Sequence, residues 1–158
     1  MDRYSILEFS KVYKRVLDIE TTLKQKMLFA LSQTYPNIEF SRLIPYLNSQ
    51  INHKKYIQNG RDIIKDLIES KKSQNEKLNK FINNAYLIDV LNILTEYKKV
   101  RKDKNFRKNF YRNVPDLNVL KQQTSSLNTL RNAIMHFDVN TYNENKIVWL
   151  NTLPYWEK

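Results

Sequence analysis

An arginine, an asparagine and a histidine stand close together late in this chain. They are Arg131, Asn132 and His136, within the segment LNTLRNAIMHFD that runs from Leu127 to Asp138. Arginine holds phosphates through a planar fork of donors, and histidine transfers protons near neutral pH. These residue types favour proton transfer at a phosphate ester, with the arginine offsetting the negative charge that develops.

The segment that carries these residues is predicted to be a helix with one buried side. Residues five apart on a helix lie about 140° from each other, so Arg131 and His136 flank the buried side on opposite edges. Asn132 and His136, four apart, share a face. One copy of the helix is therefore a poor match for a compact site, and two copies facing each other across a two-fold axis match better. Four apolar residues recur at helical spacing and are predicted to lie in the core: Leu127, Leu130, Ile134 and Phe137.

The run from Arg131 to His136, RNAIMH, matches the R-x4-H motif of HEPN-domain ribonucleases, in which a polar residue after the arginine is also typical. The N-terminal segment LDIETTLKQKMLFALSQTYPN resembles the corresponding helix of the abortive-infection (Abi-like) branch. The resemblance implies a helical bundle, usually dimeric with a composite active site, that cleaves RNA without a metal or another cofactor. It also implies a toxin or phage-defence effector, which an antitoxin or inhibitor holds silent.

The resemblance further implies a role for each residue of the motif. His136 is then the general acid/base, Arg131 holds the scissile phosphate and stabilises its developing charge, and Asn132 orients the phosphate or its neighbours. RNA supplies its own nucleophile in the 2′-hydroxyl, so the protein needs only to move protons and offset charge. Without the resemblance, the favoured interpretation of His136 is a structural histidine near a helix C-terminus, where positive charge is favoured.

Glu20 falls on the apolar stripe of the first predicted helix, between Val16 and Leu23. One interpretation is that Ile19 takes the inward position and Glu20 is solvated. The other is a partly buried carboxylate that pairs with an arginine, because an unpaired buried carboxylate is costly. Arg131 is the expected partner in that second case.

The composition limits the function classes. A net charge of +11 over 158 residues favours a polyanionic partner: RNA, DNA, an acidic protein or an anionic membrane surface. The absence of cysteine excludes disulfides, thiolate nucleophiles and cysteine-ligated zinc, and it fits a reducing cytoplasm. A single glycine excludes phosphate loops and dinucleotide fingerprints. No apolar run approaches the roughly 20 residues that span a bilayer, so no membrane partner is expected.

The segment KKVRKDKNFRKNFYR, from Lys98 to Arg112, is the densest charge run. Cationic side chains bind phosphates and aromatic rings stack on unpaired bases, so the composition suits single-stranded nucleic acid. The alternative is a solvated helix end with its aromatic rings in the core. His53 is expected to be an exposed loop residue, or else a minor RNA contact. The predicted RNA contacts are Lys102, Lys104, Arg107, Lys108, Phe110, Tyr111 and Arg112.

The scarcity of glycine and proline predicts one all-α domain over 1–158, an antiparallel helical bundle with a long first and a long central helix. The first helix is predicted from Ser5 to Tyr35, a short helix over 61–72, the central helix over 76–100 and the motif helix over about 125–138. The segment 139–158 is expected to be a short strand or an apolar tail. The buried stripe of the first helix is predicted to hold Ile6, Phe9, Tyr13, Val16, Leu23, Met27 and Ala30, and that of the short helix Ile63, Ile64, Leu67 and Ile68.

Two further functions stay open on the sequence. The first is a non-catalytic helical module that binds RNA or DNA through the basic segment, with Arg131 and His136 merely structural. The second is an interaction protein whose apolar central helix and basic surface bind an acidic partner such as an antitoxin.

Overall fold

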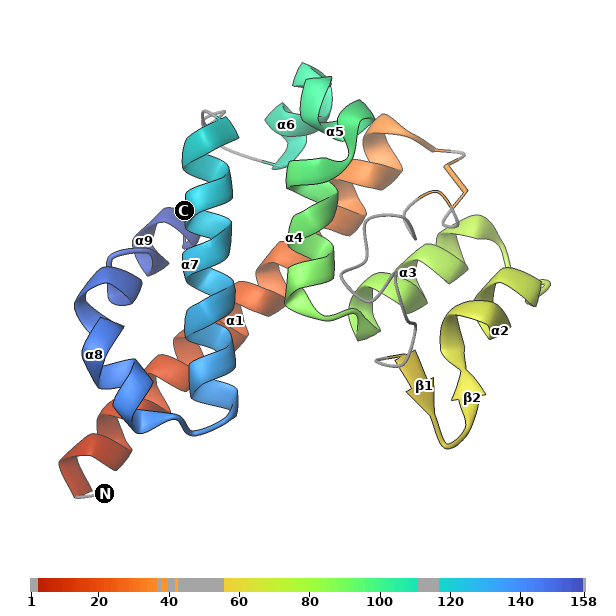
Figure 1. Ribbon diagram of the computed structural model, residues 1–158. Coiled ribbons are helices and arrows are strands. Elements are labelled where there is room, and N and C mark those ends of the chain that lie inside the picture. The colour runs from red at the N-terminus through yellow and green to blue at the C-terminus, as the bar shows by residue number, and fades with distance from the viewer. Residues whose placement is uncertain (1–2, 37, 40–41, 43–55, 111–116, 158) are drawn as a thin grey trace. The chain divides into compact units, whose positions relative to one another are not determined.

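The structure, a computed structural model, describes residues 3–36, 38–39, 42, 56–110 and 117–157. In these residues it is helical apart from one short two-stranded hairpin, which confirms the all-α prediction (Figure 1). The chain divides into two compact units. Unit 1 comprises Met1–Leu23 and Pro115–Lys158, and unit 2 comprises Lys24–Val114. The expectation of a single domain stays a prediction.

Unit 1 combines the first part of α1 (Arg3–Thr34) with α7 (Leu117–Met135), α8 (Val139–Leu150) and α9 (Leu153–Trp156). The helices α7 and α8 lie side by side and antiparallel, joined by a tight turn (Figure 1). Their shared core is apolar and aromatic. It holds Phe9, Val12, Val16, Ile19, Leu23, Leu127, Leu130, Ile134, Tyr142, Trp149, Leu153 and Trp156.

The first helix has nearly the predicted bounds, but part of its predicted buried stripe is wrong. Ile6 and Tyr13 are exposed, whereas Val12 and Ile19 are buried in their place. The buried face is therefore rotated toward the 12–16–19–23 positions, which keep the three-and-four spacing of a packed helix. The rotation leaves an exposed apolar strip on the opposite edge of the helix.

The motif helix is longer than predicted, because α7 runs from Leu117 to Met135 without a break. The predicted start at about residue 125 lies inside it, among Thr124, Ser125 and Ser126. Thr124 is buried, and Thr129 Oγ1 donates a hydrogen bond to the Ser125 carbonyl within the helix. Packing of the leucine face therefore outweighs the weak helix propensity of these residues.

The prediction of a strand or an apolar tail after Asp138 is wrong, since the segment forms α8 and α9. Asp138 is the N-cap of α8 and accepts a hydrogen bond from the Thr141 N–H at 3.1 Å. Tyr142 and Trp149, seven residues apart, face the core. The β-branched Ile147 is 75% exposed on α8.

Unit 2 contains the rest of α1, the hairpin of β1 (Ile57–Gln58) and β2 (Arg61–Asp62), and five helices among its described residues. The two turn residues of the hairpin, Asn59 and Gly60, have φ of +51° and +76°. Such a pair of positive angles is what a two-residue hairpin turn requires, and Asn-Gly supplies it at low cost. The helices are α2 (Ile63–Glu69), α3 (Gln74–Asn84), α4 (Leu87–Glu96), α5 (Lys98–Lys102) and α6 (Lys104–Phe110).

The predicted central helix over 76–100 is wrong, because α3, α4 and α5 replace it. The first break lies at Ala85 and Tyr86, where the Tyr86 N–H donates to the Tyr56 hydroxyl at 3.2 Å. That hydroxyl donates in turn to the carboxylate of Asp89, which is fully buried. The break is thus stabilised by a residue thirty positions away in the chain. In α2, Ile64 and Leu67 are buried as predicted, while Ile68 is exposed.

Candidate functional site

The residues of the R-x4-H motif lie in unit 1, on α7 and in the turn that follows it. Arg131 Nη2 lies 3.8 Å from Glu20 Oε1, and the side chains are 21% and 8% exposed. This contact confirms the interpretation that Glu20 is a buried carboxylate paired with Arg131, and the solvated alternative is wrong. Ile19 is buried beside it, so both positions face inward.

The guanidinium of Arg131 keeps unused donors. Its distance to Glu20 is longer than the roughly 2.7–2.9 Å of a tight charged hydrogen bond. Its Nη1 donates to Asn132 Oδ1 at 3.5 Å, and its Nε is buried with no acceptor in the described residues. Burial next to a carboxylate holds the side chain in place, and the N–H groups of Nη1 and Nη2 remain able to donate hydrogen bonds to an anionic oxygen.

His136 follows the last residue of α7 and its side chain is exposed. Its backbone N–H donates to the Asn132 carbonyl at 3.0 Å, which extends the helical pattern by one residue. Asn132 is exposed as well. In the described part of one chain, no hydrogen bond or ion pair joins Arg131 to His136.

The turn after α7 is a Schellman motif. The Phe137 N–H donates to the Ile134 carbonyl at 3.2 Å, and the Asp138 N–H donates to the Ala133 carbonyl at 2.9 Å. Phe137 takes the left-handed position of this motif, with φ +52°, where glycine is favoured. An L-residue pays about 1–2 kcal/mol for that conformation.

The ring of Phe137 is not in the core, so its place in the predicted buried stripe of the motif helix is wrong. It is 69% exposed, whereas the other three members of that stripe are buried. The reason is the left-handed backbone, which turns residue 137 off the helix. The ring stacks on Phe9, with centroids 6.2 Å apart and planes at 19°.

An apolar pocket of about 330 Å³ lies beside this turn. We call it the Phe137 pocket. All of its walls except Phe137 come from α1, from its exposed edge and from the buried Phe9 next to that edge. The lining residues are Ile6, Phe9, Ser10, Tyr13 and Phe137.

Asp138 is a neighbour of His136 that the sequence analysis did not single out. The hydrogen bond from Thr141 holds the pKa of the Asp138 carboxyl below its ordinary value, and the nearby His136 lowers it further. The carboxylate is therefore close enough to interact electrostatically with the imidazole. The signal in the sequence is Asp-x-x-Thr, the pattern of an N-cap at the start of α8.

The predicted nucleic-acid contacts at 98–112 divide into cations and aromatic rings. Phe110 is only 3% exposed and Phe106 is buried beneath it, so the prediction that Phe110 stacks on bases is wrong. Both rings fill the core of unit 2, where Phe106 also stacks on Tyr35. Lys102, Lys104 and Lys108 are exposed and Arg107 is half-buried. Tyr111, Arg112 and His53 lie outside the described residues.

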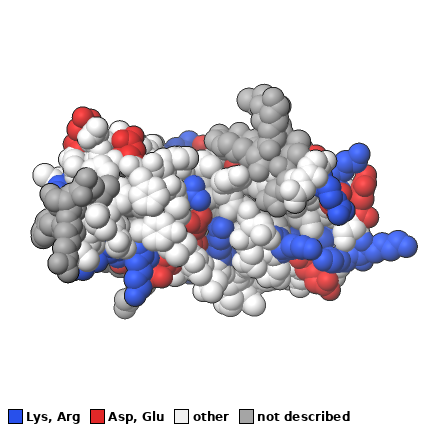
Figure 2. Space-filling model, turned by 90° about the horizontal axis from the view of Figure 1, so that it is seen from below, with Lys and Arg blue, Asp and Glu red and all other residues white. Residues whose placement is uncertain are grey.

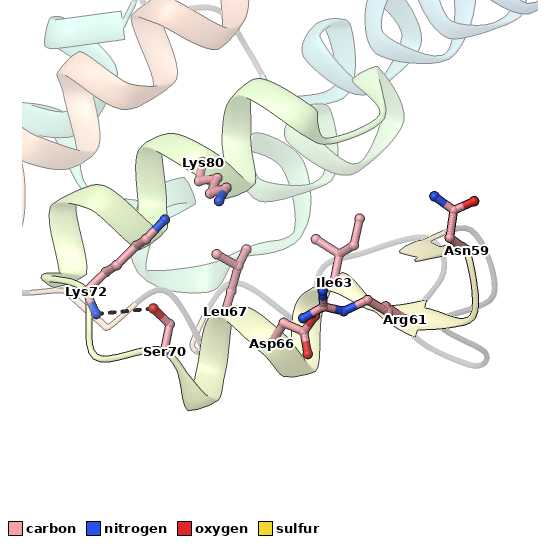
Figure 3. Close-up of a pocket in the computed structure, with 8 residues that line it drawn as sticks. All are labelled: Asn59, Arg61, Ile63, Asp66, Leu67, Ser70, Lys72 and Lys80. Atoms are coloured by element: carbon pink, nitrogen blue, oxygen red, sulfur yellow. Dashed lines mark hydrogen bonds and ion pairs between the residues drawn. The ribbon is translucent and has the colours of Figure 1, made fainter.

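A second pocket, of about 390 Å³, lies in unit 2 between the hairpin, α2 and α3 (Figure 3). Lys72 and Lys80 direct their ammonium groups toward each other at one end (Figure 3). The nearby Lys72 ammonium lowers the pKa of Lys80. At the other end Arg61 pairs with Asp66 at 3.2 Å. Two adjacent cations attract an anion, and we call this site the lysine pocket.

Charged side chains surround this part of unit 2 on the surface. On the face drawn in Figure 2, Lys and Arg side chains extend over the part of the unit that holds α2 and α3, with Asp and Glu side chains among them. Cationic and acidic side chains therefore mix on this part of the surface. Sequence spacing did not reveal it, because Lys72 and Lys80 come from different elements.

No protein-family model, curated protein or solved structure matches this chain. Within the described ranges, no helix has the length and apolar character needed to cross a membrane. The same ranges hold no group of three or more His, Asp or Glu side chains placed to bind a metal ion.

Proposed function

We propose that the protein is an endoribonuclease that cleaves RNA through the 2′-hydroxyl without a metal ion. The observation that carries the proposal is the Arg131–Glu20 pair, in which a buried carboxylate holds an arginine that keeps unused donors. A guanidinium fixed in this way is preorganised for a phosphate oxygen. The R-x4-H resemblance and the net charge of +11 support the same conclusion.

The reaction divides between the two residues of the motif. His136 removes the proton of the 2′-hydroxyl as it attacks the adjacent phosphorus, and the bond to the 5′-oxygen then breaks. A second proton transfer neutralises the leaving oxygen. Arg131 offsets the negative charge on the non-bridging oxygens, and Asn132, exposed one turn before His136, contacts the phosphate or its neighbours.

The active unit in this proposal is a homodimer. In one chain Arg131 turns toward Glu20 on α1, while His136 is exposed at the end of α7. Two copies related by a two-fold axis bring both residue types to one cleft. The rate of cleavage per chain should then rise with protein concentration until the dimer is saturated. An effector of this kind acts in the cytoplasm as a toxin or in phage defence, under the control of an antitoxin.

Replacement of His136 tests the enzyme directly. In buffer with EDTA, His136→Ala should lose about 10²–10⁴-fold of the cleavage rate on a single-stranded RNA. Because the side chain is exposed, the free energy of unfolding should stay within about 0.5 kcal/mol of the wild-type value. The control is His53→Ala, which removes the other of the two histidines. Unchanged cleavage by His136→Ala would refute the proposal.

The lysine pocket favours a second candidate, a module that binds RNA without cleaving it. Lys72 and Lys80 carry adjacent charges that a phosphate of the backbone neutralises. Binding with steep salt dependence and no cleavage product, in the wild type and in His136→Ala alike, would select this candidate.

A further inference from the structure

Phe137 is an exposed aromatic ring in a strained backbone position next to His136. A glycine would satisfy the same Schellman turn without strain, and Asp138 caps the next helix whatever residue precedes it. Strained residues gather at functional sites, where the surrounding structure holds them in place. The turn itself therefore needs no side chain at 137, and the ring requires a separate explanation.

The Phe137 pocket combines aromatic walls with two polar groups. Phe9, Tyr13 and Phe137 provide rings, and the exposed face of Phe137 is open for stacking. Ser10 Oγ donates to the Ile6 carbonyl at 3.0 Å and keeps its lone pairs as acceptors. The Tyr13 hydroxyl has no hydrogen bond within the described residues and both donates and accepts. A planar ligand with polar groups on its edge matches this lining.

We infer that the Phe137 pocket binds an unpaired nucleobase of the RNA. This inference rests on the proposed function for its ligand, and it adds a subsite that the R-x4-H motif does not contain. Unpaired bases stack on exposed aromatic rings and hydrogen-bond through their edges. A base that stacks on Phe137 and hydrogen-bonds through its edge to Ser10 and Tyr13 would contact both the rings and the polar groups of the pocket.

The position of the pocket fits a strand that is held at Arg131. Phe137 follows Arg131 by six positions, which would correspond to about 9 Å along the axis of an ideal helix. Stacked nucleotides advance roughly 3.4 Å each, so the base in the pocket lies within about three nucleotides of the phosphate held by Arg131. His136, which precedes Phe137 directly, then lies along the same strand.

The size of the pocket and the net charge of the chain favour a base over a protein segment. A volume of about 330 Å³ is at the lower end of the range for small-ligand pockets, roughly 300–1,000 Å³. The chain carries a net charge of +11, and Arg131 is at most a few nucleotides away. A second copy of this chain would bring the same positive charge to the site, whereas RNA brings the opposite charge.

Photo-crosslinking tests the pocket without relying on cleavage. A single-stranded 2′-O-methyl oligoribonucleotide, which lacks the attacking hydroxyl, carries 5-iodouridine at one position and is irradiated with the wild-type protein. Mass spectrometry of the peptides should locate the adduct on Phe137 or Tyr13. Adducts confined to the basic segment over 98–110 would overturn the inference.

Matched variants separate the ring from the backbone. Phe137→Leu keeps the side-chain bulk at the strained position and loses the ring, so adduct yield and RNA affinity should fall about tenfold. Phe137→Trp should restore both. Phe137→Gly should lose the affinity yet melt at a temperature no lower than the wild type, because it relieves the strain. Ile147→Ala, at an exposed apolar residue outside the pocket, is the control and should change neither.

The outcomes distinguish this inference from the proposed function. Normal cleavage and affinity in Phe137→Leu, with no adduct in the pocket, would overturn the base subsite and leave the ribonuclease standing. An adduct on Phe137 with no cleavage by the wild type would support the subsite and refute the enzyme. Loss of the dimer in Phe137→Leu without any adduct would mean that the Phe137 pocket forms a contact between two copies of the chain, and would overturn the inference.

Discussion

Arg131 is held by Glu20, so its replacement should affect stability as well as catalysis. Arg131→Ala leaves a carboxylate that is 8% exposed without its cation, and it should lower the free energy of unfolding by about 2–3 kcal/mol. Urea unfolding followed by circular dichroism measures this loss. Arg131→Lys keeps the positive charge but loses the planar guanidinium donors. It should lower the free energy of unfolding less than Arg131→Ala does, while still impairing cleavage.

The double variant Glu20→Gln/Arg131→Ala completes the test. Removal of the acid should recover part of the loss, with a coupling energy of about 1–2 kcal/mol between the two side chains. Strictly additive losses would mean that the 3.8 Å contact contributes nothing to stability. The same measurements are needed to interpret cleavage assays, because loss of activity in Arg131→Ala is informative only if the variant remains folded.

For single residues, the sequence offered the Glu20–Arg131 pair as one of two interpretations, and it misplaced Phe137. The pair was predictable because a carboxylate on an apolar stripe needs a cation, and arginines are few on the facing helix. Phe137 followed the helical spacing and was therefore assigned to the core. Its real position depends on a left-handed residue at the end of α7, and a non-glycine residue gives no local signal for that conformation.

Tyr142 makes a pH-dependent link between α8 and α1. Its hydroxyl donates to Glu8 Oε1 at 3.4 Å, and Lys146 Nζ lies 3.5 Å from the same oxygen. Burial first, and then the charge of Glu8 and the hydrogen bond to it, raise the pKa of Tyr142 to about 12. The neutral hydroxyl is therefore favoured by the folded state.

The raised pKa of Tyr142 predicts a loss of stability in alkali. Because the folded pKa lies above the unfolded value near 10, the contribution is fully present below pH 10 and is lost as the pH rises toward about 12. Urea unfolding at pH 8, 10 and 11 should show a decline in the wild type that is smaller in Tyr142→Phe. An equal decline in both proteins would mean that Tyr142 titrates normally.

The helices show where sequence periodicity is sufficient and where it is not. The first helix was predictable because its pattern is long and lacks breakers. The break at Ala85 and Tyr86 was not, because Tyr56 stabilises it from another part of the chain. Asn59-Gly60 is a local signal for a hairpin turn, and Asp138 is a local signal for a helix start. The prediction from overall composition did not take either signal into account.

The net charge of +11 is a property of the whole molecule that the fold distributes unevenly. The sequence assigned RNA contacts to the segment 98–112, in which the rings of Phe106 and Phe110 prove to be buried. The lysine pocket instead brings together Lys72 and Lys80, whose positions in the chain gave no signal. The two surfaces are therefore rival sites for the RNA backbone in unit 2, one visible in the sequence and one only in the structure.

Salt dependence distinguishes the two surfaces. Each phosphate of a single strand that a cation neutralises contributes about −0.7 to the slope of log Kobs against log salt. If the lysine pocket grips the backbone, Lys72→Gln/Lys80→Gln should reduce the slope by about 1.4 and leave folding intact, since two repelling charges are removed. The matched variant Lys102→Gln/Lys104→Gln removes the same charge from the exposed part of the basic segment.

A larger change in that second variant would favour the segment predicted from sequence, and equal changes would mean that net charge alone governs binding. An unchanged slope in both would contradict RNA binding through these four lysines, and would favour unit 1, with Arg131 and the Phe137 pocket, as the surface that binds the strand.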